Sequence, residues 1–384
     1  MKNFYFHNST KVYFGKDEVD KVGKLSKEFG NNVLLVYGKS SIKKTGLYDR
    51  IVKLLKAEDI NIFELGGIDP NPRIESIREG SDICKKHNID LVLGVGGGSV
   101  IDMAKLISVF AHQSGDIENY VLGNKKISDK KTPLLAIPTT AGSGAEATHF
   151  SVLYIDKNKY SVACNALLPN YVYLTSEFSK NAGPYLTACA GIDAFSQAIE
   201  SVWSVLGNNE SVGYALEAIS IIWDNLHKAV HQNSTGAKKQ MAIASNLAGK
   251  AINISKTTAP HALSYSFTSY YSIPHGHAVA LSLPFFFSYN ANVCEQDCID
   301  RRGADNVRKR IDDILKIIDV ELIDAERTLT AFIESLGLKM KIGELVSNFE
   351  PRLLIENINI ERLKNNPREV TESTISDYIE KCYA

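Results

Sequence analysis

Hydrophobic and polar positions follow two different patterns in the two halves of the chain. In the first half, short apolar runs such as residues 31–38 (NNVLLVYG), 60–65 (INIFEL) and 132–140 (TPLLAIPTT) alternate with longer amphipathic stretches. In one such stretch the apolar residues recur at helical spacing, as at Leu47 and Ile51. Short buried strands alternating with amphipathic helices predict a parallel sheet with helices on both faces.

The pattern changes near residue 180. Beyond it, strand-like alternation nearly disappears, and long stretches carry apolar residues at helical period. The clearest of these stretches are residues 180–206, 208–230, 237–252, 304–318 and 365–383. The sequence therefore predicts an α/β domain at about 1–180 and an all-helical domain at about 181–384.

Composition and charge exclude several classes of function. The 384 residues suffice for two domains, and a net charge of −1 gives no basic field for nucleic acid or an anionic membrane. No apolar run reaches the roughly 18 residues that a transmembrane helix needs, and the first residues lack the layout of a signal peptide. The six cysteines are scattered, so we expect reduced thiols in a cytoplasmic protein.

A glycine-rich segment, GVGGGSVIDMAK (94–105), follows a predicted strand and opens a predicted helix. Glycines let the backbone approach a ligand closely, and a helix N-terminus offers free N–H groups to phosphate. The segment differs from the usual G-x-G-x-x-G fingerprint, although the physics is the same. A plain tight turn is the alternative. We predict that this segment binds a dinucleotide through Gly96, Gly97, Gly98, Ser99 and Asp102.

A second loop of glycines and hydroxyls, IPTTAGSGAEAT (137–148), also follows a strand. Thr139, Thr140 and Ser143 can donate hydrogen bonds to phosphate or ribose. Two such loops at the C-terminal ends of parallel strands mark the place where folds of this kind bind nucleotides. The alternative is that one of the two loops only shapes the cleft.

The end of the first predicted strand bears on cofactor choice. The segment VYGKSSIKKTG (36–46) has no carboxylate to bind a free ribose 2′-OH. Gly38 leaves room, Ser40 and Ser41 can donate hydrogen bonds, and the lysines bring positive charge. These features favour NADP(H) over NAD(H), unless the lysines only form a solvated helix start.

Four polar residues stand in apolar helical stretches of the second half. Asp193 and Gln197 are four apart in GIDAFSQAIES (191–201), hence on one helix face, and His261 and His275 lie on two further helices. A buried carboxylate is costly unless it is paired or binds a metal. One Asp and two His from three helices therefore predict a divalent metal site, with Gln197 as a weak fourth ligand. Ordinary hydrogen-bonded core histidines are the alternative.

The chain resembles the iron-dependent (group III) alcohol dehydrogenase family. The matching motifs are DPNP (69–72), the two glycine loops, GIDAFSQAIES and PHGHAVALSLP (274–284), and they cover essentially the whole chain. The resemblance implies a dehydroquinate synthase-like architecture, with a nucleotide-binding domain, a helical metal domain and a cleft between them. It further implies reversible hydride transfer between a nicotinamide and an alcohol/aldehyde pair, in a homodimer or larger oligomer.

This sequence departs from the family pattern at two positions. The family's metal set is one Asp and three His, and Gln197 replaces the fourth ligand, a histidine. Tyr265 stands where a histidine tied to proton transfer is often found. Fe²⁺ remains the favoured metal, with Zn²⁺ and Ni²⁺ as alternatives. Tyr265, or the additional histidine His277, is then the candidate proton donor; His277 is otherwise a spare ligand or a surface ring.

A further sequence resemblance indicates the substrate. Residues 253–268 and 273–281 look most like the phosphonoacetaldehyde reductases of the family, which form 2-hydroxyethylphosphonate. A phosphonate would need cationic or hydroxyl partners, and the candidates are Lys256, Thr257, Thr258, His149 and Lys159. A broad-range short-chain aldehyde or alcohol is the alternative substrate. Two other classes stay open: a lyase like dehydroquinate synthase, and a metal-poor nucleotide-binding protein without turnover.

Overall fold

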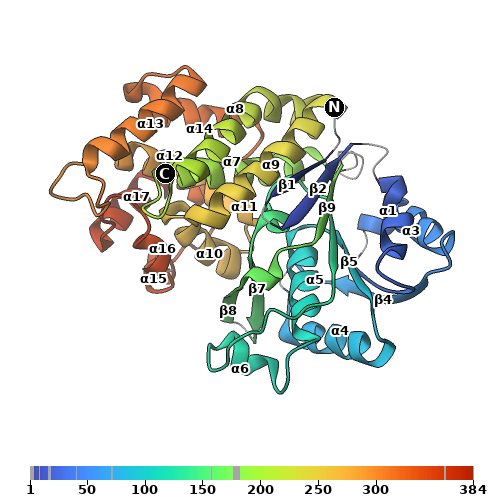
Figure 1. The fold of residues 1–384 in the computed structure, drawn as a ribbon. Helices are drawn as coiled ribbons and strands as arrows, with labels where there is room; N and C mark the ends of the chain where they lie inside the picture. The colour runs from blue at the N-terminus through green and yellow to red at the C-terminus, as the bar shows by residue number, and fades with distance from the viewer. Residues whose placement is uncertain are drawn as a thin grey trace. The chain divides into compact units, whose positions relative to one another are not determined.

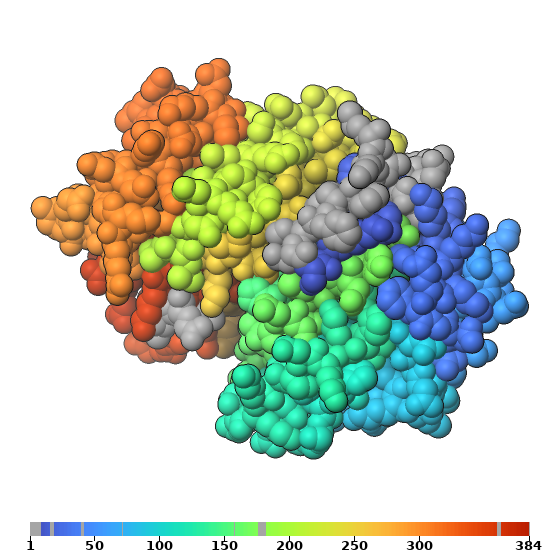
Figure 2. Space-filling view, in the orientation of Figure 1, coloured from blue at the N-terminus to red at the C-terminus, as the bar shows by residue number. Residues whose placement is uncertain are grey.

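The computed structural model describes residues 4–7, 9–15, 19–39, 41–70, 72–156, 158–175, 182–358 and 360–383 (Figures 1 and 2). The chain divides into two compact units. Unit 1 comprises Met1–Thr140 and Ala145–Asn181, and unit 2 comprises Ala141–Gly144 and Ala182–Ala384. The short segment of the second glycine loop that groups with the helical unit is a feature that the apolar pattern did not indicate.

Unit 1 is built on a seven-stranded sheet in the order β1-β2-β9-β6-β5-β3-β4. Only the first pair, β1 and β2, is antiparallel; the other neighbours are parallel, which confirms the predicted fold class. The strands are β1 (Phe4–His7), β2 (Thr10–Phe14), β3 (Asn32–Gly38), β4 (Asn61–Ile68), β5 (Leu91–Gly96), β6 (Leu134–Pro138) and β9 (Tyr171–Leu174).

Helices cover both faces of this sheet, as the alternation of β3 requires. Leu34 and Val36 belong to a core cluster with residues of α4 (Ile74–His87) and α5 (Gly98–Phe110). Their neighbours Val33 and Leu35 point the other way, into a cluster with α1 (Val22–Lys27) and α3 (Leu47–Lys56). Figure 1 shows the two helical layers on either side of the strands. The remaining helical segments of unit 1 are η1 (Val19–Lys21), α2 (Ser41–Lys44), α6 (Ile117–Val121), η2 (Ala145–Ala147) and η3 (Asn165–Leu167).

A separate hairpin, β7 (Phe150–Ile155) and β8 (Asn158–Ala163), was not expected from the sequence. Most β8 side chains are exposed or half-buried, so the strand carries no apolar alternation that could be read from the sequence. Asp156, with a φ of 53°, begins the turn between the two strands.

The described residues of unit 2 form helices joined by loops and no strand, apart from an isolated bridge between Cys298 and Arg368. Its central helix α7 (Pro184–Trp203) begins with a proline at the first helical position and is buried along most of its length. The other segments are α8 (Asn209–His231), α9 (Thr235–Ser255), α10 (Ala259–Tyr271), α11 (His275–Ala280), α12 (Leu283–Ala291), α13 (Ala304–Ile318), η4 (Leu322–Asp324), α14 (Ala325–Ser335), η5 (Ile342–Glu344), α15 (Pro351–Glu356), α16 (Ile360–Leu363) and α17 (Glu372–Tyr383). Within the described part of the chain, no helix has the length and apolar character needed to cross a membrane.

Candidate metal centre and nucleotide loops

Three side chains from three helices of unit 2 converge on one point. Asp193 of α7, His261 of α10 and His275 of α11 each offer a ligand atom, and these atoms all lie within 4.8 Å of one another. The Oδ1 atom of Asp193 is 3.2 Å from Nε2 of His261 and 3.9 Å from Nε2 of His275. The side chains of Asp193 and His261 are 9% and 6% exposed, whereas that of His275 is 37% exposed. The cluster is therefore open on the His275 side.

The local sequence explains why these helices meet. Pro260 sits in the first turn of α10, Ser272 ends that helix in the left-handed region, and Pro274 immediately precedes α11. Gly276 then lets α11 lie directly on α7, because a Cβ at this position would be 1.9 Å from the carbonyl oxygen of Cys189 and 3.1 Å from Cβ of Asp193. The glycine between the two histidines thus brings His275 to Asp193.

Gln197 lies one turn after Asp193 on α7 and is buried. Its Nε2 donates to the carbonyl oxygen of Ser143 at 3.4 Å, but its Oε1 is buried without a hydrogen-bond partner. An orphaned buried carbonyl oxygen is costly, and a cation beside it would remove that cost. A carboxylate, two imidazoles and an amide oxygen make a donor set that suits a divalent transition metal. The residues present therefore fit the metal that the sequence predicted.

Glu200 contacts the cluster and is not among the residues that the sequence predicted. It is fully buried on α7, and its carboxylate accepts hydrogen bonds from the backbone N–H and the hydroxyl of Thr258 at 2.6 and 2.9 Å. The same carboxylate pairs with Nδ1 of His261. Fixing Nδ1 in this way turns Nε2 toward Asp193 and sets the tautomer that a metal ligand needs. The signal was present, because Asp193, Gln197 and Glu200 are spaced i, i+4 and i+7 on one helix face.

The electrostatics of the cluster favour an ionised Asp193. Burial by itself raises the pKa of Asp193, but the hydrogen bond from His261 and the charges of His275 and His261 hold that pKa below its ordinary value. Burial likewise lowers the pKa of His261, but Glu200 and Asp193 outweigh it and raise the pKa to about 9. The imidazolium of the metal-free protein thus supplies positive charge where a metal would supply it, and metal binding would displace its proton.

The two candidate proton donors occupy different surroundings. The Tyr265 ring stacks parallel to the His275 ring at a centroid distance of 6.2 Å, and burial raises the pKa of its phenol. His277 is 1% exposed, so the alternative of a surface ring is wrong. Its Nδ1 is 2.9 Å from the hydroxyl of Tyr185 and its Nε2 is 2.7 Å from the carbonyl oxygen of Lys339. Both ring nitrogens of His277 are thus engaged within the protein.

The predicted substrate-binding residues have different surroundings within their own units. Lys256 follows α9 with an exposed side chain, at a φ of 56°. Thr257 is buried and accepts a hydrogen bond from Arg362, while Thr258 belongs to the Glu200 network. His149 lies in unit 1, where its ring contacts Phe150 edge-on.

The first glycine loop connects β5 to α5 in unit 1, as predicted. A Cβ at Gly96 would be 2.5 Å from Cγ2 of Val100, so this glycine is required for packing of the strand against the helix. Gly97 precedes α5 and has only ordinary contacts, the nearest being the Thr140 hydroxyl at 3.5 Å. Gly98 and Ser99 open the helix, and the Ser99 hydroxyl donates to the carbonyl oxygen of Pro70. The loop thus presents the helix N-terminus beside Thr140.

Asp102 and Lys105 of the same helix anchor neighbouring segments of unit 1. The Asp102 carboxylate accepts from the backbone N–H of Val152 at 3.1 Å, so it ties α5 to β7, and a cofactor contact for it stays a prediction. Lys105, which the sequence reasoning did not single out, is fully buried and donates to Thr148 and to the carbonyl oxygens of Ala145 and Phe150. Burial lowers the pKa of Lys105.

The second glycine loop is shared between the units. Thr139 and Thr140 directly follow β6 in unit 1, where the Thr139 N–H donates to the carbonyl oxygen of Gly96 at 2.9 Å. Ser143 belongs to unit 2, and the flanking Gly144, with a φ of +58°, packs against Gly249 of α9 at a distance that excludes a side chain. The two threonines therefore lie beside the first loop, and their role in cofactor binding stays a prediction.

The end of β3 is less basic than the sequence suggested. Lys39 forms an ion pair with Asp69, a carboxylate that comes from the segment after β4. Lys43 lies over the rings of Tyr37 and Tyr48 at 5.4 and 5.1 Å. A Cβ at Gly38 would have only ordinary contacts, so the glycine leaves room rather than serving packing. Ser40 and the Ser41 side chain lie outside the described residues.

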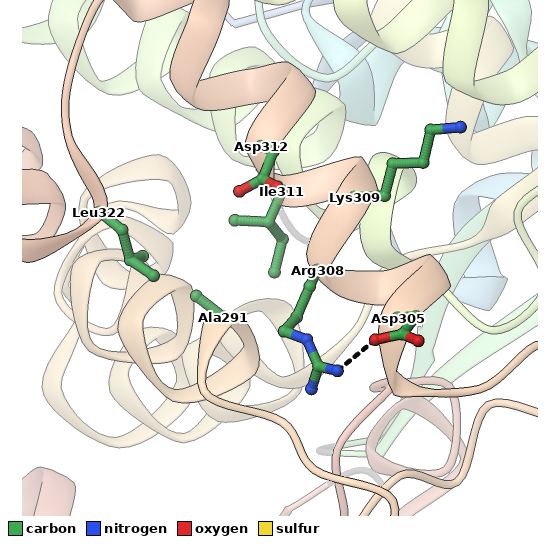
Figure 3. Close-up of a pocket in the computed structure, with 7 residues that line it drawn as sticks. All are labelled: Ala291, Asp305, Arg308, Lys309, Ile311, Asp312 and Leu322. Carbon is green, nitrogen blue, oxygen red and sulfur yellow. Dashed lines mark hydrogen bonds and ion pairs between the residues drawn. The ribbon is translucent and has the colours of Figure 1, made fainter.

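A cavity of about 270 Å³ lies elsewhere in unit 2 (Figure 3). Arg308 and Asp305 form an ion pair on its wall. None of its lining residues is a predicted site residue; they are Ala291, Asp305, Arg308, Lys309, Ile311, Asp312 and Leu322.

Comparison with known proteins agrees with this geometry. Residues 9–176 match the family described as iron-containing alcohol dehydrogenase, and residues 187–383 match the C-terminal part of the Fe-containing alcohol dehydrogenase family. NADH-dependent butanol dehydrogenase A of Clostridium acetobutylicum is 33% identical over 76% of this chain and 77% of its own length. The NADPH-dependent butanol dehydrogenase of Clostridium saccharobutylicum is 27% identical over 95% of this chain and 90% of its own. A solved structure of an iron-containing alcohol dehydrogenase from Thermotoga maritima has a TM-score of 0.83 at 30% identity and covers 99% of both chains. This chain belongs to the iron-containing alcohol dehydrogenase family.

Proposed function

We propose that this metal-dependent alcohol oxidoreductase reduces an aldehyde to a primary alcohol at a metal held by Asp193, Gln197, His261 and His275. Membership of the family makes it a nicotinamide-dependent alcohol dehydrogenase. The observation that carries the residue assignment is the meeting of three ligand atoms from three helices, with the orphaned Gln197 oxygen nearby on α7. Fe²⁺ is the proposed metal, with Zn²⁺ and Ni²⁺ as alternatives.

When bound, the metal polarises the carbonyl as a Lewis acid and the nicotinamide supplies the hydride. The chain's own residues do the positioning. Glu200 holds Nδ1 of His261, so that Nε2, which donates to Asp193 in the metal-free protein, would turn its lone pair to the metal once its proton is displaced. Tyr265, stacked on the partly exposed His275, is the proposed donor of the proton that completes the alcohol. His277 uses its ring nitrogens to hold α11 to Tyr185 and Lys339, so we assign it a positioning role.

We assign cofactor binding to unit 1. The backbone N–H groups of Gly97, Gly98 and Ser99 at the start of α5 suit a pyrophosphate, and Thr139 and Thr140 lie beside them. NADP(H) is the proposed cofactor, supported by the room at Gly38 and the lysines of α2. The Asp69–Lys39 pair weighs against it, and relatives of both cofactor types are known.

Phosphonoacetaldehyde is the proposed substrate, supported by the resemblance of residues 253–268 and 273–281 to reductases of that aldehyde. Short-chain alcohols and aldehydes are the second candidate, favoured by the butanol dehydrogenases among the relatives. The test is NADPH oxidation by anaerobically prepared, iron-loaded protein with phosphonoacetaldehyde and butyraldehyde in parallel, and NADH as the cofactor control. A large preference in kcat/KM for phosphonoacetaldehyde supports the first substrate. Equal rates, or a preference for butyraldehyde, would rule out phosphonoacetaldehyde as the preferred substrate.

The metal assignment has its own test. His261→Ala should abolish metal content and turnover together, because it deletes the most buried imidazole of the cluster. Full turnover in that variant would overturn the assignment.

We also propose a cytoplasmic homodimer. The cytoplasmic location is consistent with six free thiols, and the dimer is testable by sedimentation.

A further inference from the structure

The positively charged side chain of Arg362 lies near the more exposed side of the metal cluster, on a helix that the sequence did not predict. Arg362 lies in α16, and its guanidinium carbon is 5.6 Å from the centroid of the Tyr265 ring. Tyr265 in turn stacks on His275, whose side chain is the exposed member of the cluster. The guanidinium is therefore at most about 12 Å from the His275 ring. Its positive charge acts to lower the pKa of the Tyr265 phenol, although burial outweighs it.

Arg362 is held in place by its surroundings. Its guanidinium donates to the hydroxyl of Thr257, which is 2% exposed and lies four residues before His261. Asn365, 5% exposed, fixes the chain just beyond it by donating to the carbonyl oxygens of Ser255 and Thr257 at 2.8 and 3.0 Å. The backbone N–H of Asn365 also donates to the carbonyl oxygen of Arg362 at 3.1 Å. These hydrogen bonds from Asn365 thus hold Arg362 close to the start of α10.

We propose that Arg362 determines substrate specificity by anchoring an anionic group at the far end of the aldehyde. This inference rests on the proposed function and deepens it. A guanidinium carries five N–H groups in a planar fork that suits two oxygens of a phosphonate, sulfonate or carboxylate. A divalent metal would balance the charges of Asp193 and Glu200, and Arg362 adds one positive charge to these groups. The preferred substrate is therefore a short aldehyde with an oxyanion.

This assignment replaces Lys256 as the cation of the substrate site. Lys256 is exposed after the end of α9, whereas Arg362 contacts both the Thr257 hydroxyl and the Tyr265 ring. A lysine would offer a point charge without the planar fork, so Arg362→Lys should retain only part of the preference.

The test compares two aldehydes of similar shape, phosphonoacetaldehyde and 3,3-dimethylbutyraldehyde, in which a neutral tert-butyl group replaces the phosphonate. We expect the wild-type, metal-loaded enzyme to prefer the anion in kcat/KM. Arg362→Gln should lower the ratio of the two kcat/KM values by about 100-fold, as expected for loss of charge-assisted hydrogen bonds. Lys364→Gln is the matched control, because it removes an exposed positive charge two residues away and should leave the ratio unchanged.

A second measurement does not depend on turnover of the anionic aldehyde. Methylphosphonate should inhibit reduction of 3,3-dimethylbutyraldehyde competitively in the wild-type and Lys364→Gln enzymes, and at least tenfold more weakly in Arg362→Gln. Equal losses for both aldehydes in Arg362→Gln, or a wild-type enzyme without preference for the anion, would overturn the role of Arg362 while leaving the reductase function intact. Failure of the wild-type enzyme to reduce either aldehyde with NADPH or NADH would instead overturn the proposed function, and this inference with it.

Discussion

At the scale of single residues, we propose that position 197 affects how tightly the cluster binds its metal. Gln197 offers an amide oxygen that is buried without a partner, whereas an imidazole binds borderline metals such as Zn²⁺ and Fe²⁺ more strongly. We expect Gln197→His to lower the Kd for Zn²⁺ by about tenfold or more. Competition against a chromophoric chelator measures this. Gln197→Met, which keeps the length and removes the oxygen, should raise the Kd, and an unchanged Kd in both variants would exclude Gln197 as a ligand.

Glu200 should act on the metal without touching it. Gln in its place keeps the shape but loses the negative charge beside Nδ1 of His261. Replacing such outer partners typically weakens metal affinity by about 10–100-fold, and we expect this loss for Glu200→Gln. Glu217→Gln, on the exposed face of α8, is the control and should bind metal like the wild type. If calorimetric metal titrations show the two variants to be alike, the orienting role of Glu200 is wrong.

Asp69 should oppose the 2′-phosphate of NADP(H). Its negative charge would repel the phosphate. It also forms an ion pair with Lys39 at the end of β3, so this lysine is less able to attract the phosphate. A unit charge about 4 Å away is worth about 1 kcal/mol in water, and we expect Asp69→Asn to raise the NADPH-to-NADH ratio of kcat/KM by about fivefold. Asp49→Asn, an exposed carboxylate in the first turn of α3, should leave the ratio unchanged. A ratio that does not move in Asp69→Asn would show that this end of β3 does not contact the ribose.

At the scale of elements, the contact of α11 with α7 depends on Gly276. A methyl group there would overlap the Cys189 carbonyl, so Gly276→Ala must push α11 away from α7 and separate His275 from Asp193. We expect about 1–3 kcal/mol of lost stability, measured by denaturant unfolding, together with weaker metal binding. Gly213→Ala in α8 has open space around the new methyl group and should instead stabilise by about 0.5–1 kcal/mol. Unimpaired metal binding in Gly276→Ala would show that the geometry of the metal site does not depend on this glycine.

The elements also show what could be predicted from the sequence. The strands β3, β5 and β6 are continuous apolar runs buried on both faces, and runs of this kind were recognised. The mostly exposed strand β8 has no such pattern and was missed. Asp193, His261 and His275 were found because polar residues stand out in apolar helices. Glu200 and Arg362 were not, because their roles depend on contacts made only after helices distant in sequence pack together.

At the scale of the whole molecule, metal and nucleotide should stabilise different parts of the chain. All the candidate metal ligands lie in unit 2 and link α7, α10 and α11, whereas the helix N-terminus proposed to bind phosphate belongs to unit 1. A ligand stabilises the structure to which it binds by an amount set by its concentration relative to Kd. Chelation of the metal-loaded enzyme should therefore speed amide hydrogen exchange in these three helices and leave β3, β5 and β6 unchanged.

The complementary experiment adds NADPH to the chelated protein. Exchange should then slow at the start of α5 and around Thr139 and Thr140, while α7, α10 and α11 stay as fast as in the metal-free protein. Protection of those three helices by NADPH alone would mean that the two sites are energetically coupled even without the metal. Protection confined to unit 1 would mean that NADPH binding does not stabilise the helices that carry the candidate metal ligands, so the metal alone would order them.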